Sequence, residues 1–241
     1  MSVEISVVIP VKDEAGNVSG LLDEVRAALG TRSFEVVFID DGSSDRTVET
    51  LLARKTSVPE LRIVRHSENC GQSSAIRSGV LVARGAVIVT LDGDGQNDPA
   101  DIPALLAKYQ SRADDPAFGL VMGQRTRRHE SQRKKLASKF ANWARARALG
   151  DHTRDVGCGL KAFKKDAYLR LPYFHGMHRF IPALMIREGY TIDFVDVGDR
   201  PRGSGKSKYG VLDRAAQAIP DLLGVMWLKQ RTRLPKQRTE I

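Results

Sequence analysis

The first hundred residues alternate between short apolar runs and segments whose apolar residues recur at helical spacing. Val3–Val11 is rich in β-branched residues, as expected of a central parallel strand that is buried on both faces. A helix is expected next, with Asn17 as its cap and apolar positions from Leu21 to Leu29. Strands that alternate with helices predict a parallel sheet covered on both sides. The expected fold class is therefore α/β with a mostly parallel sheet.

The other expected elements follow from the same criteria. Further strands are expected at 34–39, 61–64, 86–91, 120–123, 155–163 (with a turn) and 191–197, and further helices at 48–52, 71–83, 136–143, 178–188 and 211–228. We expect one domain at residues 1–210, followed at 211–241 by an amphipathic helix and a basic tail. This last segment is expected to contact a membrane surface or a second subunit.

Composition excludes several classes of protein. The 41% of hydrophobic residues argues against a disordered chain, and the two cysteines, which form no CxxC pair, argue against a disulfide scaffold and favour a reducing compartment. The apolar N-terminal run lacks a basic region before it and is expected to be a strand, not a signal peptide. The 38 basic residues exceed the 29 acidic ones by nine, which implies an anionic partner: nucleic acid, a phosphorylated substrate or an anionic membrane.

The most informative stretch is DGDGQ at residues 92–96, which directly follows the expected strand at 86–91. Two carboxylates just past a buried strand are costly unless a cation compensates them, and oxygen ligands favour Mg²⁺ or Mn²⁺. An EF-hand loop does not fit, because it needs Gly where Asn97 stands and Glu where Pro103 stands. The alternative is a polar turn that caps the next helix. Its position at a strand end favours the metal site.

A second acidic motif, DDGSSD at residues 40–45, ends the second expected strand. Alone it is typical of a turn with a helix cap. Parallel sheets bind ligands at the carboxyl ends of their strands, so two acidic turns at neighbouring ends favour a nucleotide site. Residues 10–16 read PVKDEAG and lack the G-x-G-x-x-G motif, which argues against a dinucleotide oxidoreductase.

Two basic segments supply cations. Residues 202–208 read RGSGKSK, but Arg200 occupies the position of the leading glycine of a Walker A loop, so that motif does not fit. Flexible glycines with cations suit a loop that closes on phosphates, and a solvated basic loop is the alternative. Residues 124–135 form a second basic cluster, which is either solvated surface or a site for an anionic acceptor or membrane phosphates.

Four motifs in this order resemble those of the inverting family 2 glycosyltransferases, which have the Rossmann-like GT-A fold. They are VIPVKDE at 8–14, IDDGSSD at 39–45, LDGDGQNDP at 91–99 and R-x-x-G-x-S-K at 202–208. The branch that the chain resembles includes the dolichol-phosphate mannose synthases and the bacterial polyprenyl-phosphate glycosyltransferases. The resemblance implies transfer of one sugar from a nucleotide-sugar to a polyprenyl phosphate, for cell-envelope glycan, lipid or protein glycosylation.

The resemblance also implies roles for individual residues. The nucleotide-sugar would be bound by Pro10, Lys12, Glu14, Ile39, Asp40, Asp41, Asp92, Gly93, Asp94, Arg125, Arg202 and Lys208. The metal, Mg²⁺ or Mn²⁺, would be held by Asp94 and Gln96 beside Asp92, and the acceptor by Arg125, Arg133 and Asp155. The catalytic residues would be Asp94, Arg125, Arg202 and Lys208. Lys12 stands where many relatives have an aromatic residue, which leaves the base open.

The implied enzyme works without a strong general base, because a polyprenyl phosphate is already anionic near pH 7. Its expected place is the cytoplasmic face of the membrane, in peripheral contact with anionic lipid, and a homodimer is the alternative use of the C-terminal helix. The sugar stays open among GDP-mannose, UDP-glucose and a UDP-hexuronate. Other hypotheses are a family 2 enzyme that extends a saccharide, a nucleotidyltransferase and a basic nucleic-acid-binding module, and no nucleic-acid partner is expected.

Overall fold

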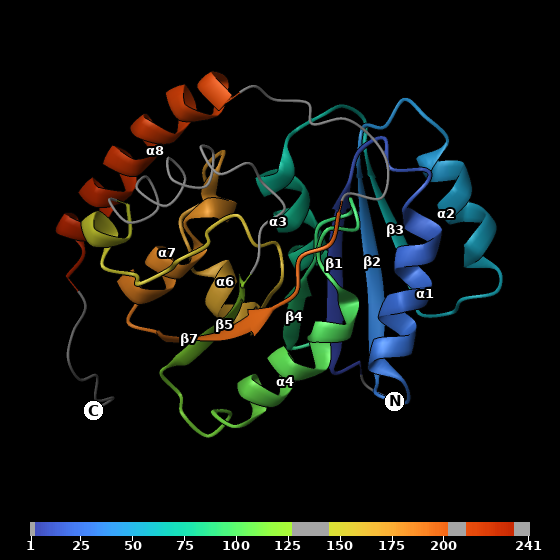
Figure 1. Ribbon diagram of the computed structural model, residues 1–241, viewed down its shortest axis with the longest axis horizontal. Coiled ribbons are helices and arrows are strands. Elements are labelled where there is room, and N and C mark those ends of the chain that lie inside the picture. Colours follow the sequence, from blue (N-terminus) through green and yellow to red (C-terminus); the bar gives the residue numbers. More distant parts are fainter. Residues whose placement is uncertain (1–2, 127–144, 202–210, 234–241) are drawn as a thin grey trace, which may run out of the picture.

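A computed structural model describes residues 3–126, 145–201 and 211–233, with side chains from Ile219 onward in the last segment. Its centre is a seven-stranded sheet with the strand order β3-β2-β1-β4-β6-β5-β7 (Figure 1). The strands are β1 (Ile5–Val11), β2 (Phe34–Asp41), β3 (Leu61–His66), β4 (Val87–Thr90), β5 (Phe118–Arg125), β6 (Lys161–Lys164) and β7 (Thr191–Val197). The first four strands are parallel, so their carboxyl ends meet at one edge.

Helices cover both faces of the sheet. They are α1 (Val18–Leu29), α2 (Thr47–Lys55), α3 (Gln72–Val82), α4 (Ile102–Gln110), α6 (Lys165–Leu169), α7 (Ile181–Arg187) and α8 (Val211–Arg231), with 3-10 turns η1 (Pro99–Asp101) and η2 (Met177–Arg179). The apolar sides of α1, α2 and α4 pack on one face of the sheet, and those of α3, α6 and α7 pack on the other. α8 lies outermost, next to α7 (Figure 1).

The strands are apolar on both sides because both faces are covered. In β1, Val7 and Ile9 belong to the core beneath α1, whereas Val8 belongs to the core beneath α3. Gly79 of α3 lies directly against Val8 and Ile39, where an added Cβ would come within 2.6 Å of both side chains. This close approach sets α3, whose N-terminus lies at the carboxyl edge, firmly on the sheet.

The α/β fold class with its mostly parallel sheet is confirmed, with one reversal. β6 lies between β4 and β5 and runs antiparallel to both. Its beginning therefore lies at the edge where β4 ends. Hydrophobic periodicity indicates a strand but not its direction, so the sequence carried no sign of the reversal.

Asn17 stands at the N-cap position of α1, as predicted, but its side chain does not cap the helix. Asn17 precedes α1, but its side-chain amide donates to the carboxylate of Glu14 at 2.5 Å and caps no backbone N–H. The first strand begins at Ile5 and not at Val3, and the helix expected at 178–188 is divided into η2 and α7. The helix expected at 136–143 lies outside the described residues.

The helix expected at 211–228 is α8, which continues to Arg231 and contains Pro220. Val225 of α8 is fully buried against the core on the α7 side, with Leu222 and Met226 packed beside it. Among the helices that the structure describes, none is both long enough and apolar enough to cross a bilayer.

Candidate functional site

The loop after β4 lies across the end of β1. At Gly93 an added Cβ would lie 2.9 Å from the Pro10 carbonyl oxygen and 2.5 Å from a methyl carbon of Val11, so only glycine fits without movement. Gly95 has a positive φ of 76°, which glycine adopts without strain. The two glycines therefore turn the chain sharply and place the carboxylates on either side of Gly93 at the carboxyl edge of the sheet.

Groups on α3, β5 and β6 set the environment of Asp92. The side-chain amide of Gln72, at the start of α3, donates to Asp92 Oδ1 at 2.8 Å. Burial and the charge of Asp94 raise the pKa of Asp92 to about 6, against the opposing charges of Lys161 and Arg125. A buried carboxylate that repels its neighbour destabilises the fold when it ionises, and it is a good ligand for a cation.

Asp94 and Gln96 form the outer part of the same loop. The Gln96 backbone N–H donates to Asp94 Oδ1 at 3.1 Å, and the Gln96 carbonyl accepts from the Arg200 backbone N–H at 3.0 Å. The Arg200 guanidinium pairs with Glu24 at 2.7 Å and with Asp98 at 2.6 Å. These contacts fasten the residues just before the glycine-rich basic segment to the acidic loop.

Asp40 and Asp41, at the end of β2, are both buried. Asp40 accepts from the Ser43 backbone N–H at 3.3 Å and lies 3.5 Å from Arg65. Asp41 accepts from the backbone N–H groups of Cys70 and Gly71 at 2.9 and 2.8 Å. The two carboxylates thus fix the turn after β2 and the loop that leads into α3.

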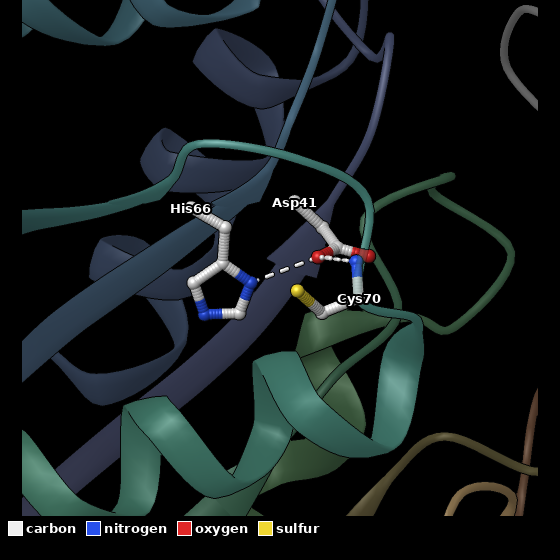
Figure 2. A group of neighbouring side chains, drawn as sticks. All are labelled: Asp41, His66 and Cys70. Carbon is white, nitrogen blue, oxygen red and sulfur yellow. Dashed lines mark hydrogen bonds and ion pairs between the residues drawn. The ribbon is translucent and has the colours of Figure 1, made fainter.

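Asp41 also bonds to His66 Nδ1 at 2.8 Å, and Figure 2 shows these two side chains with the Cys70 thiol beside them. Their ligand atoms lie within 4.8 Å of one another, the one such group of three among the described residues. The other ring nitrogen of His66 bonds to Ser78 at 2.9 Å. Because both imidazole nitrogens and both Asp41 oxygens have hydrogen-bond partners, the cluster acts in this structure as a brace between β2, β3 and α3.

Lys12, Glu14 and Ile39 lie at the ends of β1 and β2. The Lys12 ammonium donates to the Gly42 carbonyl at 2.8 Å and so links the two strand ends. Glu14 is buried, and its backbone N–H donates to Thr47 Oγ1 at 2.9 Å. The Ile39 side chain is fully buried in the core beneath α3. Of the three, Lys12 is the one that presents a charge at the edge.

Arg125, at the end of β5, is clamped by two carboxylates. Its guanidinium binds Asp155 through two hydrogen bonds of 2.6 and 3.1 Å, and it reaches Asp199 at 3.3 Å. All three side chains are 13% exposed or less. The Arg125 charge also lowers the pKa of Asp92, so the clamp and the acidic loop belong to one edge of the molecule.

The structure therefore brings together at this edge most of the site residues predicted from the sequence. These are Pro10, Lys12, Asp40, Asp41, Asp92, Gly93, Asp94, Gln96, Arg125 and Asp155. Arg133, Arg202 and Lys208 lie outside the described residues. Gln72, Lys161, His66 and Asp199 could not be predicted from the sequence, because they are single polar residues without a motif around them.

Comparison with known proteins gives one family match and close curated relatives. The model of "Glycosyl transferase family 2" matches residues 6–171. The chain is 36% identical to a dodecaprenyl-phosphate galacturonate synthase of Rhizobium johnstonii, over 94% of this chain and 67% of that protein. It is also 36% identical to an undecaprenyl-phosphate 4-deoxy-4-formamido-L-arabinose transferase of Pectobacterium carotovorum, over 86% of this chain and 63% of that protein. The chain thus spans about two thirds of the length of these relatives.

Solved structures show the same fold. A crystal structure of glucosyl-3-phosphoglycerate synthase from Mycobacterium tuberculosis, in complex with Mn²⁺, UDP-glucose and phosphoglyceric acid, matches with a TM-score of 0.70. The match covers 93% of this chain and 80% of that chain at 18% sequence identity. At this identity the likeness concerns the fold, and it extends over both the regular first half of the sheet and the irregular second half.

Proposed function

The chain belongs to glycosyl transferase family 2 and has the GT-A fold, and from this membership we propose that it transfers one sugar from a nucleotide-sugar to a polyprenyl phosphate with inversion at the anomeric carbon. Two relatives at 36% identity support the acceptor, since both are named for a polyprenyl-phosphate product or substrate. The alternative within the family is an enzyme that extends a saccharide acceptor.

The observation that carries the proposal is the set of oxygen groups after β4. Asp92, Asp94 and Gln96 offer two carboxylates and one amide oxygen within five residues, at the end of a strand. Oxygen donors of this kind fit Mg²⁺ or Mn²⁺. The raised pKa of Asp92, caused by burial and by Asp94, supports the fit, because a divalent cation would compensate the charge that makes ionisation costly.

Asp94 and Gln96 would hold the ion, with Asp92 beside it, and the ion would neutralise charge on the departing diphosphate. The chain's own cations have a separate task, which is to bring an anionic donor and an anionic acceptor together. Arg125 is oriented for this task by its two carboxylate partners. We assign Arg202 and Lys208 to the same role and Arg133 and Asp155 to the acceptor side.

For the sugar we propose a hexuronate as the first candidate. The support is the similarity to a galacturonate synthase over 94% of this chain. A formamido-arabinose is the second candidate, on the similarity to the transferase of that sugar. A panel of sugar nucleotides that includes UDP-galacturonate, UDP-glucose and GDP-mannose separates these from the other donors.

We further propose that α8 contacts the membrane surface that carries the acceptor. Ile219, Leu223 and Trp227 recur every four residues, on one side of the helix, and are 61%, 60% and 57% exposed. Lys229, Arg231 and Arg233 follow them and would attract anionic lipid. The free cysteines, Cys70 and Cys158, support a reducing compartment and hence the cytoplasmic face.

Transfer to lipid is tested with purified protein, labelled sugar nucleotide, a polyprenyl phosphate and Mn²⁺. We expect a chloroform-soluble labelled product and a released nucleoside diphosphate. Asp94→Ala should abolish turnover, whereas Asp114→Ala, which changes an exposed carboxylate, should leave it intact. Product that forms only with a saccharide acceptor would replace the proposal by the glycan-extending alternative, and release of pyrophosphate would indicate a nucleotidyltransferase.

Membrane contact is tested by sedimentation with vesicles that contain anionic lipid. Replacing Ile219, Leu223 and Trp227 together by Ser should release the protein from the vesicles without changing its thermal stability. Unchanged vesicle binding would contradict the proposal. A wild-type dimer that the same replacements convert to a monomer, with no vesicle binding in either protein, would assign this side of α8 to a second copy of the chain.

A further inference from the structure

Lys161 is a buried lysine outside the motifs of the sequence. It lies at the start of β6, in the middle of the sheet, opposite Thr90 of β4 and Met122 of β5. The residue is only 5% exposed. A buried ammonium group is costly unless a negative charge or hydrogen-bond acceptors compensate it, so its surroundings need an explanation.

The register of β6 against β4 places the turn before Lys161 next to the acidic loop. Because Thr90 pairs with Lys161 in an antiparallel ladder, the residue two positions after Thr90 faces the residue two positions before Lys161. These residues are Asp92 and Gly159. They are in close contact, since a Cβ added at Gly159 would lie 2.3 Å from Asp92 Cγ.

The Lys161 ammonium reaches back to the same place. It donates a hydrogen bond to the carbonyl of Cys158, which belongs to the peptide bond just before Gly159. The Cys158–Gly159 peptide is therefore flanked by the Lys161 ammonium and the Asp92 carboxylate. The hydroxyl of Thr90 donates to the Gly159 carbonyl at 2.7 Å and holds this turn against β4.

Lys161 is the cation whose charge lowers the pKa of Asp92 most, ahead of Arg125. Arg125, the other cation that acts on Asp92, is already bound to Asp155 and Asp199. Burial lowers the pKa of Lys161, and Arg125 adds to this effect, whereas the charges of Cys158 and Asp92 oppose it. Gln72 adds a neutral hydrogen bond to Asp92.

We propose that Lys161 is a positioning residue of the donor site. Its positive charge balances the charge of the Asp92 carboxylate and orients this group to bind the cation and diphosphate of a nucleotide-sugar. This inference rests on the proposed function. Lys161 touches neither the donor nor the acceptor, and it acts through Asp92. Its effect belongs to donor binding rather than to acceptor recognition.

The test measures binding of Mn²⁺ together with UDP, and separately with GDP, by isothermal titration calorimetry. Lys161→Met removes the charge and the hydrogen bond, Lys161→Gln keeps a donor without the charge, and Lys161→Arg keeps both. For Met and Gln we expect affinity to fall by about 10- to 100-fold, the range typical of residues that orient metal ligands, and for Arg to stay within about threefold of wild type. Lys165→Met is the matched control, because the Lys165 ammonium also donates to a backbone carbonyl, that of Ala83, away from the acidic loop.

A double-mutant cycle with Asp92→Asn separates positioning from a general structural effect. If Lys161 acts through Asp92, the loss of affinity caused by Lys161→Gln should disappear in the Asp92→Asn background.

Wild-type affinity in both Lys161→Met and Lys161→Gln, or an equal loss of affinity in the two backgrounds, overturns the inference. Failure of the wild-type protein to bind either nucleotide with Mn²⁺ is a different result, which overturns the proposed function itself. Thermal unfolding of each variant identifies any that do not fold. If Lys161→Met does not fold, the affinities of Lys161→Gln and Lys161→Arg are compared instead.

Discussion

Asp92 is a residue whose environment opposes its own charge. It lies next to Asp94 in a partly buried loop, and burial together with this repulsion raises its pKa from 3.8 to about 6. A group with a raised pKa binds its proton more tightly in the folded state than in the unfolded state. The free energy of unfolding therefore falls as the pH rises from about 4 to about 6.

Asp92→Asn should accordingly stabilise the protein at neutral pH when no divalent ion is present. Asparagine does not ionise, so the variant escapes the cost of the buried charge, which amounts to up to about 3 kcal/mol for a shift of this size. The gain should be present at pH 7.5 and vanish near pH 4, as measured by urea unfolding in the presence of EDTA. A difference between the variant and wild type that does not change with pH would contradict this account of Asp92.

Gly159→Ala should weaken binding of Mn²⁺ with a nucleoside diphosphate. The added methyl group would come within 2.5 Å of both Asp92 carboxylate oxygens, so the carboxylate has to move. Gly198→Ala is the control, because the Cβ there would meet only Asp101 Oδ2, at an ordinary 3.6 Å. Equal affinities of the two variants, measured by calorimetry, would show that Asp92 has room to move without losing its function.

At the scale of elements, Arg125 joins three parts of the chain that are distant in sequence. It extends from the end of β5 to Asp155, in the loop before β6, and to Asp199, in the segment after β7. The carboxylates are 5% and 4% exposed, so the pairs are largely withdrawn from water. Breaking such pairs from one side costs much more than removing an exposed pair.

Arg125→Met should therefore lower the free energy of unfolding by about 3 kcal/mol, since two buried carboxylates would lose a shared cation. Arg154→Met, which removes a cation paired with the 60% exposed Asp196, should cost less than about 1 kcal/mol. Chemical denaturation of both variants at pH 7 provides the measurement. Similar losses in the two variants would mean that the Arg125 clamp adds no stability of its own.

The elements differ in how far the sequence could predict them. The strands around Val7 and Phe38 are continuous apolar runs, and the structure contains them within two residues of the expected limits. The acidic loop after β4 was predicted because two carboxylates in a turn are conspicuous.

Lys161 was not predicted, because a lysine in a short strand is usually exposed, and only the pairing of β6 with β4 buries it near Asp92. Gln72 and His66 were not predicted for the same reason, since their roles depend on contacts between elements.

At the scale of the whole molecule, α8 is the outermost layer, and its two sides have different surroundings. Val225 is fully buried, whereas Ile219 is 61% exposed. The Lys229 ammonium donates to the Leu149 carbonyl and ties the end of the helix to the catalytic body. α8 is thus held to the protein along one side, while the other stays available to an outside surface.

Substitutions on the two sides of α8 should separate stability from surface contact. Val225→Ala should lower the free energy of unfolding by about 2 kcal/mol, because it leaves a cavity against α7. Ile219→Ala should change it by less than about 0.5 kcal/mol, since little surface is buried there. Thermal and urea unfolding test both values, and a large loss for Ile219→Ala would show that this side is packed as well.

The reversed strand β6 has a consequence for how such enzymes diversify. A strand that runs against its neighbours delivers its beginning, and not its end, to the edge where the others finish. The segment just before β6 therefore contacts the loop after β4, where Gly159 lies against Asp92. A chimera that takes its first hundred residues from one relative and the remainder from another therefore has to keep a small residue opposite Asp92, in addition to the paired strands β4 and β6 and the apolar core that both halves share.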